Sequence, residues 1–260
     1  MAGRLKVSLA LSGGAARGAF HLGVLSALEE IGIEIEAISG TSIGSVIAVG
    51  YGSGLRPYEM LEIFKSKAFK KVLQFNYFQK GVLKIDESAS ILQTFAPIKK
   101  LEAMVRPTFI TCVDVLSGKI VRFSEGDAIT LAIASSALMP LFRPIAYENY
   151  LLIDGGFMDN LPIAPLKAFD VPIFGVDLHP LLESQKRHFF GVYFRSLFLT
   201  FIASSQSQIE ACDVYITDSR LEGSTLFGFG DLDKCFSLGY ESGHQQILTY
   251  LSQTMYNKCF

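Results

Sequence analysis

Short apolar runs alternate with helically spaced apolar residues through the first fifty positions of the chain. The run KVSLAL at residues 6–11 is short and favours a strand. Apolar residues then recur at helical spacing across residues 19–31, and Gly32 is a residue type that commonly ends a helix. The segment IEIEAIS at residues 33–39 alternates as a strand does, and residues 43–54 are apolar enough for a buried helix. The pattern therefore predicts strand, helix, strand and helix in that order.

Five further strand candidates follow, with helical segments between several of them. They lie at residues 108–115, 119–125, 150–154, 172–178 and 213–217. Short apolar strands connected by helices are typical of a mostly parallel sheet that is covered on both faces. The chain is therefore predicted to have an α/β fold with three layers, α/β/α, around a mostly parallel central sheet. In such sheets the functional residues lie in the loops at the carboxyl ends of the strands.

Composition limits the classes of protein that the chain can belong to. It has no internal repeat, low-complexity block or long polar linker, so residues 1–260 are expected to form a single domain. The formal net charge of −2 and the pI near 6.1 give no reason to expect a nucleic-acid partner. Half of the residues are hydrophobic, but every run long enough to span a bilayer contains a charge or a glycine. The excess of apolar residues is expected to form a large core, to line an apolar pocket, to form a face that contacts a membrane, or some mixture of these.

The N-terminus and the cysteines are most simply explained by a cytoplasmic protein. The apolar run after the first basic residues is too short for a signal-peptide core and leads directly into a glycine-rich loop. The cysteines are far apart and lack zinc-site spacing, so they are interpreted as free thiols in a reducing compartment, although an even number also permits disulfides. They are Cys112, Cys212, Cys235 and Cys259.

A glycine-rich loop, LSGGAARGAF at residues 11–20, lies between the first strand and the first helix. Backbone N–H groups at such a helix start bind anions or stabilise an oxyanion. The competing interpretation is the dinucleotide-binding pattern G-x-G-x-x-G, but Ala15 stands where its middle glycine belongs. Glu34 and Glu36 lie roughly where that motif has its ribose-binding acid. Taken alone, this loop leaves both roles open.

The second loop, Gly40-Thr41-Ser42-Ile43-Gly44, has the G-x-S-x-G pattern of a nucleophile elbow. In an elbow of this kind, glycines relieve crowding where a strained turn lifts the serine Oγ out of the sheet. The pattern is short, and an ordinary structural loop is the competing interpretation. Its position after a strand-like run and before a helix-like run favours Ser42 as a nucleophile.

The third loop follows the predicted strand at residues 150–154. Asp154 ends this strand and precedes Gly155 and Gly156. A carboxylate there is held at the edge of the sheet, and the glycines let other backbone approach it. The competing interpretation is a simple Asp-Gly hairpin turn.

Together the three loops resemble the patatin-like phospholipase family. The matching segments are GGAARG at residues 13–18, GTSIG at residues 40–44 and DGG at residues 154–156. Two further segments fit: IASSALMPLFRP at residues 133–144, before the aspartate, and DNLPI at residues 159–163, after it. The likeness covers roughly residues 6–180, and residues 181–260 are expected to be the C-terminal part of the same domain.

The resemblance implies a lipid acyl hydrolase, of phospholipase A or lysophospholipase type, with a serine–aspartate dyad. Ser42 would attack the ester carbonyl, and Asp154 would act as the general base for both acylation and hydrolysis of the acyl-enzyme. The oxyanion hole would consist of backbone N–H groups of Gly13, Gly14, Ala15 and Ala16. The supporting residues of the motifs would be Arg17, Gly18, Gly40, Gly44, Gly155 and Gly156. No metal ion and no organic cofactor is needed.

Two of these positions need comment. Family members often have a third glycine where this chain has Ala15, but the alanine keeps its backbone N–H, so the oxyanion site is expected to survive. Arg17 would either brace the loop or contact a lipid phosphate.

Two alternatives to the dyad hydrolase stay open. The first is a conventional Ser-His-Asp esterase, because His179, His188 and His244 all follow Asp154 and His179 ends a strand. The second is a nucleotide-binding or regulatory module that kept the fold but not the chemistry. His21, on the first helix, is expected to pack there.

Two segments suggest contact with a membrane, which would make the substrate a membrane lipid and the location peripheral at the inner membrane face. Residues 64–84 interleave lysines with aromatic residues, which suits an anionic membrane surface or a solvated helix with its aromatics in the core. Residues 189–203 are apolar on nearly every side except at Arg195. They favour a buried helix, a flap over an acyl-chain pocket, or both.

Asp114 and Asp177 end strands near the same edge and are expected to cap loops.

Overall fold

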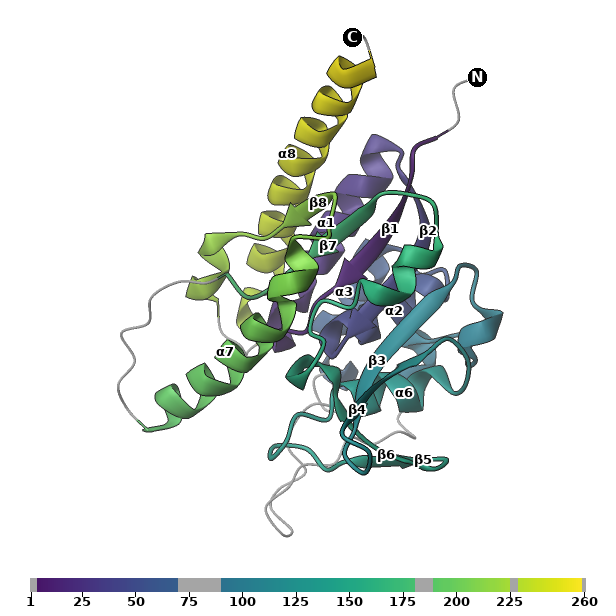
Figure 1. Ribbon diagram of the computed structural model, residues 1–260, viewed down its shortest axis with the longest axis vertical. Coiled ribbons are helices and arrows are strands. Elements are labelled where there is room, and N and C mark those ends of the chain that lie inside the picture. The colour runs from purple at the N-terminus through teal and green to yellow at the C-terminus, as the bar shows by residue number, and fades with distance from the viewer. Residues whose placement is uncertain (1–3, 70–89, 181–188, 225–228, 259–260) are drawn as a thin grey trace.

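An eight-stranded mixed sheet forms the centre of the protein (Figure 1). The structure is a computed structural model that describes residues 4–69, 90–180, 189–224 and 229–258. The strands follow the order β5-β6-β3-β2-β1-β7-β8, and β4 pairs with β3. Their bounds are β1 Lys6–Leu11, β2 Glu34–Thr41, β3 Thr108–Asp114, β4 Lys119–Phe123, β5 Ile145–Tyr147, β6 Tyr150–Asp154, β7 Ile173–Val176 and β8 Val214–Ile216.

The parallel part of the sheet consists of β3, β2, β1, β7 and β8, and it confirms the predicted α/β fold. The strands β4 and β6 pair with β3 in antiparallel fashion, and β5 pairs antiparallel with β6 at the edge of the sheet. The pattern of apolar residues predicts seven of these strands and misses β5. β5 is Ile-Ala-Tyr, in which alanine is a weak strand former, whereas the equally short β8 is Val-Tyr-Ile, three strong strand formers.

Helices connect the strands and cover the sheet. They are α1 Ala19–Ile31, α2 Ile43–Gly52, α3 Pro57–Lys65, α5 Ser90–Phe95, α6 Ala128–Ser135, α7 Phe189–Ile209 and α8 Leu232–Lys258. Short 3-10 turns include η1 Ala15–Gly18, η3 Gly155–Phe157 and η4 Ala164–Ala168. Leu9 and Leu11 of β1 pack into the core with residues of α1, α2 and α8, whereas Ala10 faces the opposite core with Leu161 and Leu166. This alternation produces the three layers.

Glycines bring α1 and α8 into close contact, and α8 runs alongside α1 in Figure 1. A Cβ on Gly23 would lie 2.0 Å from the Phe236 carbonyl oxygen, and a Cβ on Gly239 would lie 2.0 Å from that of Phe20. Each helix therefore needs a residue without a side chain where it meets the other. The first helix also ends as predicted, because Gly32 adopts the left-handed conformation with φ 85°.

We expect Gly239→Ala to destabilise the protein by about 3 kcal/mol, because its methyl group must displace backbone rather than a flexible side chain. Gly243→Ala is the matched control on the same helix, since its nearest neighbour, the Cα of Val24, is 3.2 Å away. Urea denaturation followed by circular dichroism measures both. Equal losses for the two variants would contradict the close-contact explanation.

Of the two segments expected to contact a membrane, the structure describes residues 64–69 of the first and the helix that contains the second, residues 189–203. Phe64 and Phe69 are buried, and both rings contact Phe95, so these two aromatics serve the core. The part of the segment at residues 70–84 lies outside the described residues. On α7, Phe201 is buried while Val192 and Leu199 are exposed. Within the described ranges, the helices are all too short or too polar to cross a membrane.

Candidate active site

Ser42 lies on a sharp turn between β2 and α2. Its φ of 54° and ψ of −125° are unusual for a residue with a side chain, so the turn is strained. The Ser135 hydroxyl supports this turn: it accepts the Ser42 N–H at 2.8 Å and donates to the Thr111 carbonyl at 2.6 Å. The Ser45 hydroxyl donates to the Ser42 carbonyl at 2.6 Å. These contacts fix the backbone on both sides of a half-buried serine.

The two glycines of this turn allow the backbone to come very close to itself. A Cβ on Gly40 would lie 2.3 Å from the Gly44 carbonyl, and a Cβ on Gly44 would lie 2.3 Å from the Leu11 carbonyl oxygen. Helix α2 therefore starts directly against the end of β1. This contact brings the glycine-rich loop after β1 next to Ser42.

Asp154 reaches Ser42 because of the register of three neighbouring strands. Thr41 pairs with Thr111, and the next residue of β3, Cys112, pairs with Asp154. Ser42 therefore follows β2 at the level of Asp154, close enough for its hydroxyl to lower the pKa of the Asp154 carboxyl. Because β6 is antiparallel, it approaches from the opposite direction and ends where the elbow begins.

The Asp154 carboxyl is buried and has a strongly altered proton affinity. Burial raises its pKa to about 7, against the lowering effect of hydrogen bonds from the Gly156 N–H and from Ser42. The Gly156 bond is 2.8 Å long. The segment before the strand also holds the residue, since the Asp154 N–H donates to the Ala137 carbonyl at 3.2 Å. A carboxyl with a pKa near neutrality is suited to accept and return a proton at physiological pH.

The glycine-rich loop lies beside Ser42, but its four N–H groups are not equivalent. A Cβ on Gly13 would lie 3.1 Å from the Ser42 Cβ. The Gly13 N–H already donates to Asn160 Oδ1 at 3.1 Å. For Gly14, Ala15 and Ala16, no described residue accepts the N–H. These three groups remain available for an anion.

The conformation of the loop depends on its surroundings. Gly14 has φ 152° and Ala15 has φ 53°. Arg17 is buried and braces the loop, because its guanidinium donates to the Leu178 carbonyl at 3.1 Å and to the Ser224 carbonyl at 3.4 Å. Of the two roles expected for Arg17, these contacts favour bracing. A Cβ on Gly18 would clash with Ile43, so this glycine allows η1 to pack against α2.

The histidines do not form a triad with Ser42 and Asp154 in the part of the chain that the structure describes. The Nδ1 atom of His179 lies 3.3 Å from both Asp177 Oδ1 and Asn160 Nδ2. His21 is buried with Nε2 2.9 Å from the Ser12 carbonyl, and burial lowers its pKa to about 4. His244 lies on α8 beside Tyr240. His188 is outside the described residues.

The other side-chain predictions have simple outcomes. Asp114 caps the turn after β3 by accepting the N–H of Ser117, as expected. Glu34 and Glu36 form ion pairs with Lys6 at the amino ends of the strands, away from the glycine-rich loop. Cys112, Cys212 and Cys235 are free thiols, and Cys259 lies outside the described residues. The described residues contain no group of three metal-ligating side chains.

The segment DNLPI connects the third loop to β2. The Thr41 hydroxyl donates to the Asp159 carbonyl at 2.8 Å, and the buried Asp159 side chain forms an ion pair with Arg122. Two functional candidates, Ser135 and Asn160, lie in motif-like segments but were not singled out from the sequence. A serine or asparagine in such a segment has no local signal, because its partners are remote in the chain.

Comparison with known proteins identifies the family. The structure places a strained serine elbow, a buried carboxyl and a glycine-rich loop at one edge of an α/β sheet. The family model described as "Patatin-like phospholipase" matches residues 9–167, more than half of the chain, and the chain belongs to this family.

The individual relatives described next are less than one-third identical to this chain. An NTE family protein of Mycobacterium tuberculosis is 32% identical over 164 residues, 62% of this chain and 45% of that protein. Lysophospholipase NTE1 of Mycosarcoma maydis is 30% identical over 203 residues, 70% of this chain and 10% of that protein. The chain thus spans less than half the length of these relatives. VipD from Legionella pneumophila shares the fold, with a TM-score of 0.63, 13% identity and coverage of 95% of this chain and 67% of VipD.

We expect Ser135→Ala to lower the free energy of unfolding by about 2 kcal/mol, because it leaves the Ser42 N–H and the Thr111 carbonyl without their buried partner. Ser136→Ala is the control, since that hydroxyl bonds only to the Ala132 carbonyl one turn earlier in the chain. Urea titrations of the two variants give the comparison. A Ser135 variant as stable as the Ser136 variant would show that the elbow does not need this support.

Proposed function

We propose that this protein hydrolyses carboxylic esters of lipids, as a phospholipase A or lysophospholipase, through a Ser42–Asp154 dyad. The observation that carries the proposal is the strand register that places Ser42, on its strained turn, beside the buried Asp154 carboxyl, whose pKa the Ser42 hydroxyl lowers. Membership of the patatin-like phospholipase family and the likeness to lysophospholipase NTE1 support a lipid as substrate. His179 contacts Asp177 and Asn160, which favours the dyad over a triad.

The reaction proceeds in two halves. In the first, Asp154 takes the proton of Ser42 as Oγ attacks the ester carbonyl carbon, and the proton then passes to the leaving alcohol. In the second, a water molecule gives a proton to Asp154 and attacks the acyl-enzyme, which releases the fatty acid and restores the Ser42 hydroxyl. The open N–H groups of Gly14, Ala15 and Ala16 stabilise the oxyanion in both halves, and one such donor contributes about 3 kcal/mol. Neither half requires a metal ion or an organic cofactor.

Aromatic side chains beside Asp154 supply an apolar wall for an acyl chain. The rings of Phe157 and Phe201 contact edge to face with centroids 5.5 Å apart, and Phe198 contacts Phe201. Phe201 also approaches Gly156, where a Cβ would lie 3.2 Å from the ring. A long acyl chain in this position stays out of water while its ester faces Ser42.

Exposed apolar residues near this wall fit transient contact with a membrane, at which a cytoplasmic enzyme would meet its lipid. Met158 follows η3, and Val192 and Leu199 lie on α7; all three are more than 40% exposed. Helix α7 contacts η3 and extends outward from the sheet in Figure 1. Apolar side chains placed this way can enter the headgroup region of a bilayer.

A fluorophosphonate probe tests the assignment of Ser42. We expect the unaltered protein to be labelled and to release fatty acid from mixed phospholipid vesicles, and Ser42→Ala to do neither. Asp154→Asn is expected to slow both reactions by about 10²–10⁴-fold, because the general base is lost. Labelling that persists in Ser42→Ala would place the nucleophile elsewhere.

The pH dependence tests the assignment of Asp154. Because its pKa is about 7 in the folded protein, kcat/KM is expected to rise with pH to a plateau, with a midpoint near 7. His179→Ala is expected to keep this midpoint, and His244→Ala serves as a control histidine variant. If the fall of kcat/KM at acid pH disappeared in His179→Ala but not in His244→Ala, the base would be a histidine and the enzyme a conventional triad esterase.

The raised pKa of Asp154 also predicts that its ionised carboxylate destabilises the folded protein. An aspartate with a raised pKa in the folded state stabilises the protein when protonated, and this contribution is lost between about pH 4 and pH 7. We therefore expect the melting temperature of Asp154→Asn, relative to the unaltered protein, to increase from pH 4 to pH 8. A difference that is constant over this range would contradict the raised pKa.

A further inference from the structure

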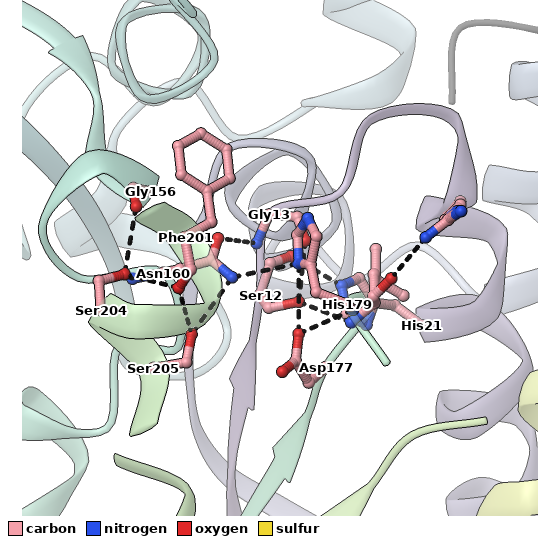
Figure 2. Close-up of polar contacts among 12 residues, drawn as sticks. Ser12, Gly13, His21, Gly156, Asn160, Asp177, His179, Phe201, Ser204 and Ser205 are labelled. Atoms are coloured by element: carbon pink, nitrogen blue, oxygen red, sulfur yellow. Dashed lines mark hydrogen bonds and ion pairs between the residues drawn. The ribbon is translucent and has the colours of Figure 1, made fainter. Parts of the chain in front are cut away.

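Asn160 is fully buried where three parts of the site meet (Figure 2). Its Oδ1 accepts the Gly13 N–H of the glycine-rich loop at 3.1 Å. Its Nδ2 lies 3.3 Å from His179 Nδ1, just after β7, and 3.4 Å from the Ser205 hydroxyl on α7. The same Oδ1 lies 3.1 Å from where a Cβ on Gly156 would be. One side chain thus touches the oxyanion loop, the loop after Asp154 and helix α7.

The contacts of Asn160 determine which way its amide points. An amide oxygen only accepts and an amide nitrogen only donates, so the Gly13 N–H requires the oxygen on its side. The nitrogen then donates to the Ser205 hydroxyl and lies against His179 Nδ1.

Asp177 holds the His179 ring behind Asn160. Its Oδ1 accepts the backbone N–H of His179 at 3.0 Å, and its Oδ2 accepts the Tyr215 hydroxyl at 3.0 Å. The same Oδ1 lies 3.3 Å from His179 Nδ1. These contacts fix the imidazole ring against which the Asn160 amide lies.

We propose that Asn160 is the positioning residue of the oxyanion hole: it takes up the Gly13 N–H and thereby aims the N–H groups of Gly14, Ala15 and Ala16 at the ester carbonyl. The proposal rests on the hydrolase function proposed above and revises the oxyanion hole expected from the sequence, since Gly13 becomes an anchor instead of a donor. The positive φ of Ala15 requires such an anchor, because an alanine keeps this conformation only when its surroundings impose it.

The anchor matters because an oxyanion hole depends on exact placement of its donors. Misplacing a reacting group by about 1 Å can cost about 100-fold in rate. We therefore expect Asn160→Ala to lower kcat for ester hydrolysis about 100-fold, with KM within about twofold, because only the transition state carries the oxyanion. Ser204→Ala is the matched control: its hydroxyl accepts the backbone N–H of Asn160 at 3.2 Å but does not contact the amide. It is expected to keep kcat within about twofold.

One measurement that does not depend on activity accompanies the kinetics. Hydrogen exchange of the Gly13 amide is expected to accelerate in Asn160→Ala and not in Ser204→Ala. A side chain that only fills space would leave this exchange unchanged. If Asn160→Ala fails to fold, Asn160→Asp keeps the shape and an acceptor for Gly13, so Gly13 should stay protected, and fast exchange of Gly13 in that variant would overturn the anchor.

The outcomes separate this proposal from the hydrolase function. If the unaltered protein releases no fatty acid, the proposed function fails, but Gly13 exchange still decides whether Asn160 anchors the loop. If the protein is active and Asn160→Ala keeps kcat within about threefold, or changes KM instead, the positioning role is overturned. Unchanged Gly13 exchange in Asn160→Ala would overturn it as well.

Discussion

The site depends on one constraint, the placement of Ser42 beside a buried Asp154 carboxyl. Burial makes the carboxylate costly to ionise, which raises its affinity for the proton that it takes from serine in the proposed reaction. The sheet provides the geometry: the register of β2, β3 and β6 sets the two residues at the same level, one strand apart. Ser135 holds the strained elbow, and the Gly156 N–H holds the carboxyl. A small shift in register would separate the dyad.

In the described structure, the residues around this pair hold the loops in position and have no acid–base role in the proposed reaction. Arg17 braces the glycine-rich loop through carbonyl groups, and Asn160 takes up the N–H of Gly13. His179 and Asp177 form a buried layer behind Asn160. In this account the histidine near the site orients an amide, which explains how a histidine can lie so close to a serine hydrolase centre without acting as its base.

Much of the fold was predictable because its signals are local. Alternation marks β1 and β2, helical spacing marks α1, and the glycines around Ser42 indicate a turn that only glycines permit. The remote contacts were not predictable. The antiparallel direction of β6 follows from how the chain folds over β3, and the Ile-Ala-Tyr sequence of β5 is only weakly strand-like. The bond between Gly13 and Asn160 joins residues 147 positions apart, so the sequence alone left Gly13 among the oxyanion donors.

The central claim is tested most directly by titrating the Asp154 carboxyl itself. Infrared difference spectra between the unaltered protein and Asp154→Asn, recorded as a function of pH, isolate the band of this one protonated carboxyl group. The account predicts a midpoint near 7, which moves upward in Ser42→Ala because the Ser42 hydroxyl lowers the pKa of Asp154. A midpoint near the ordinary value of 3.8, or one that ignores the loss of Ser42, would contradict a buried base in contact with its nucleophile.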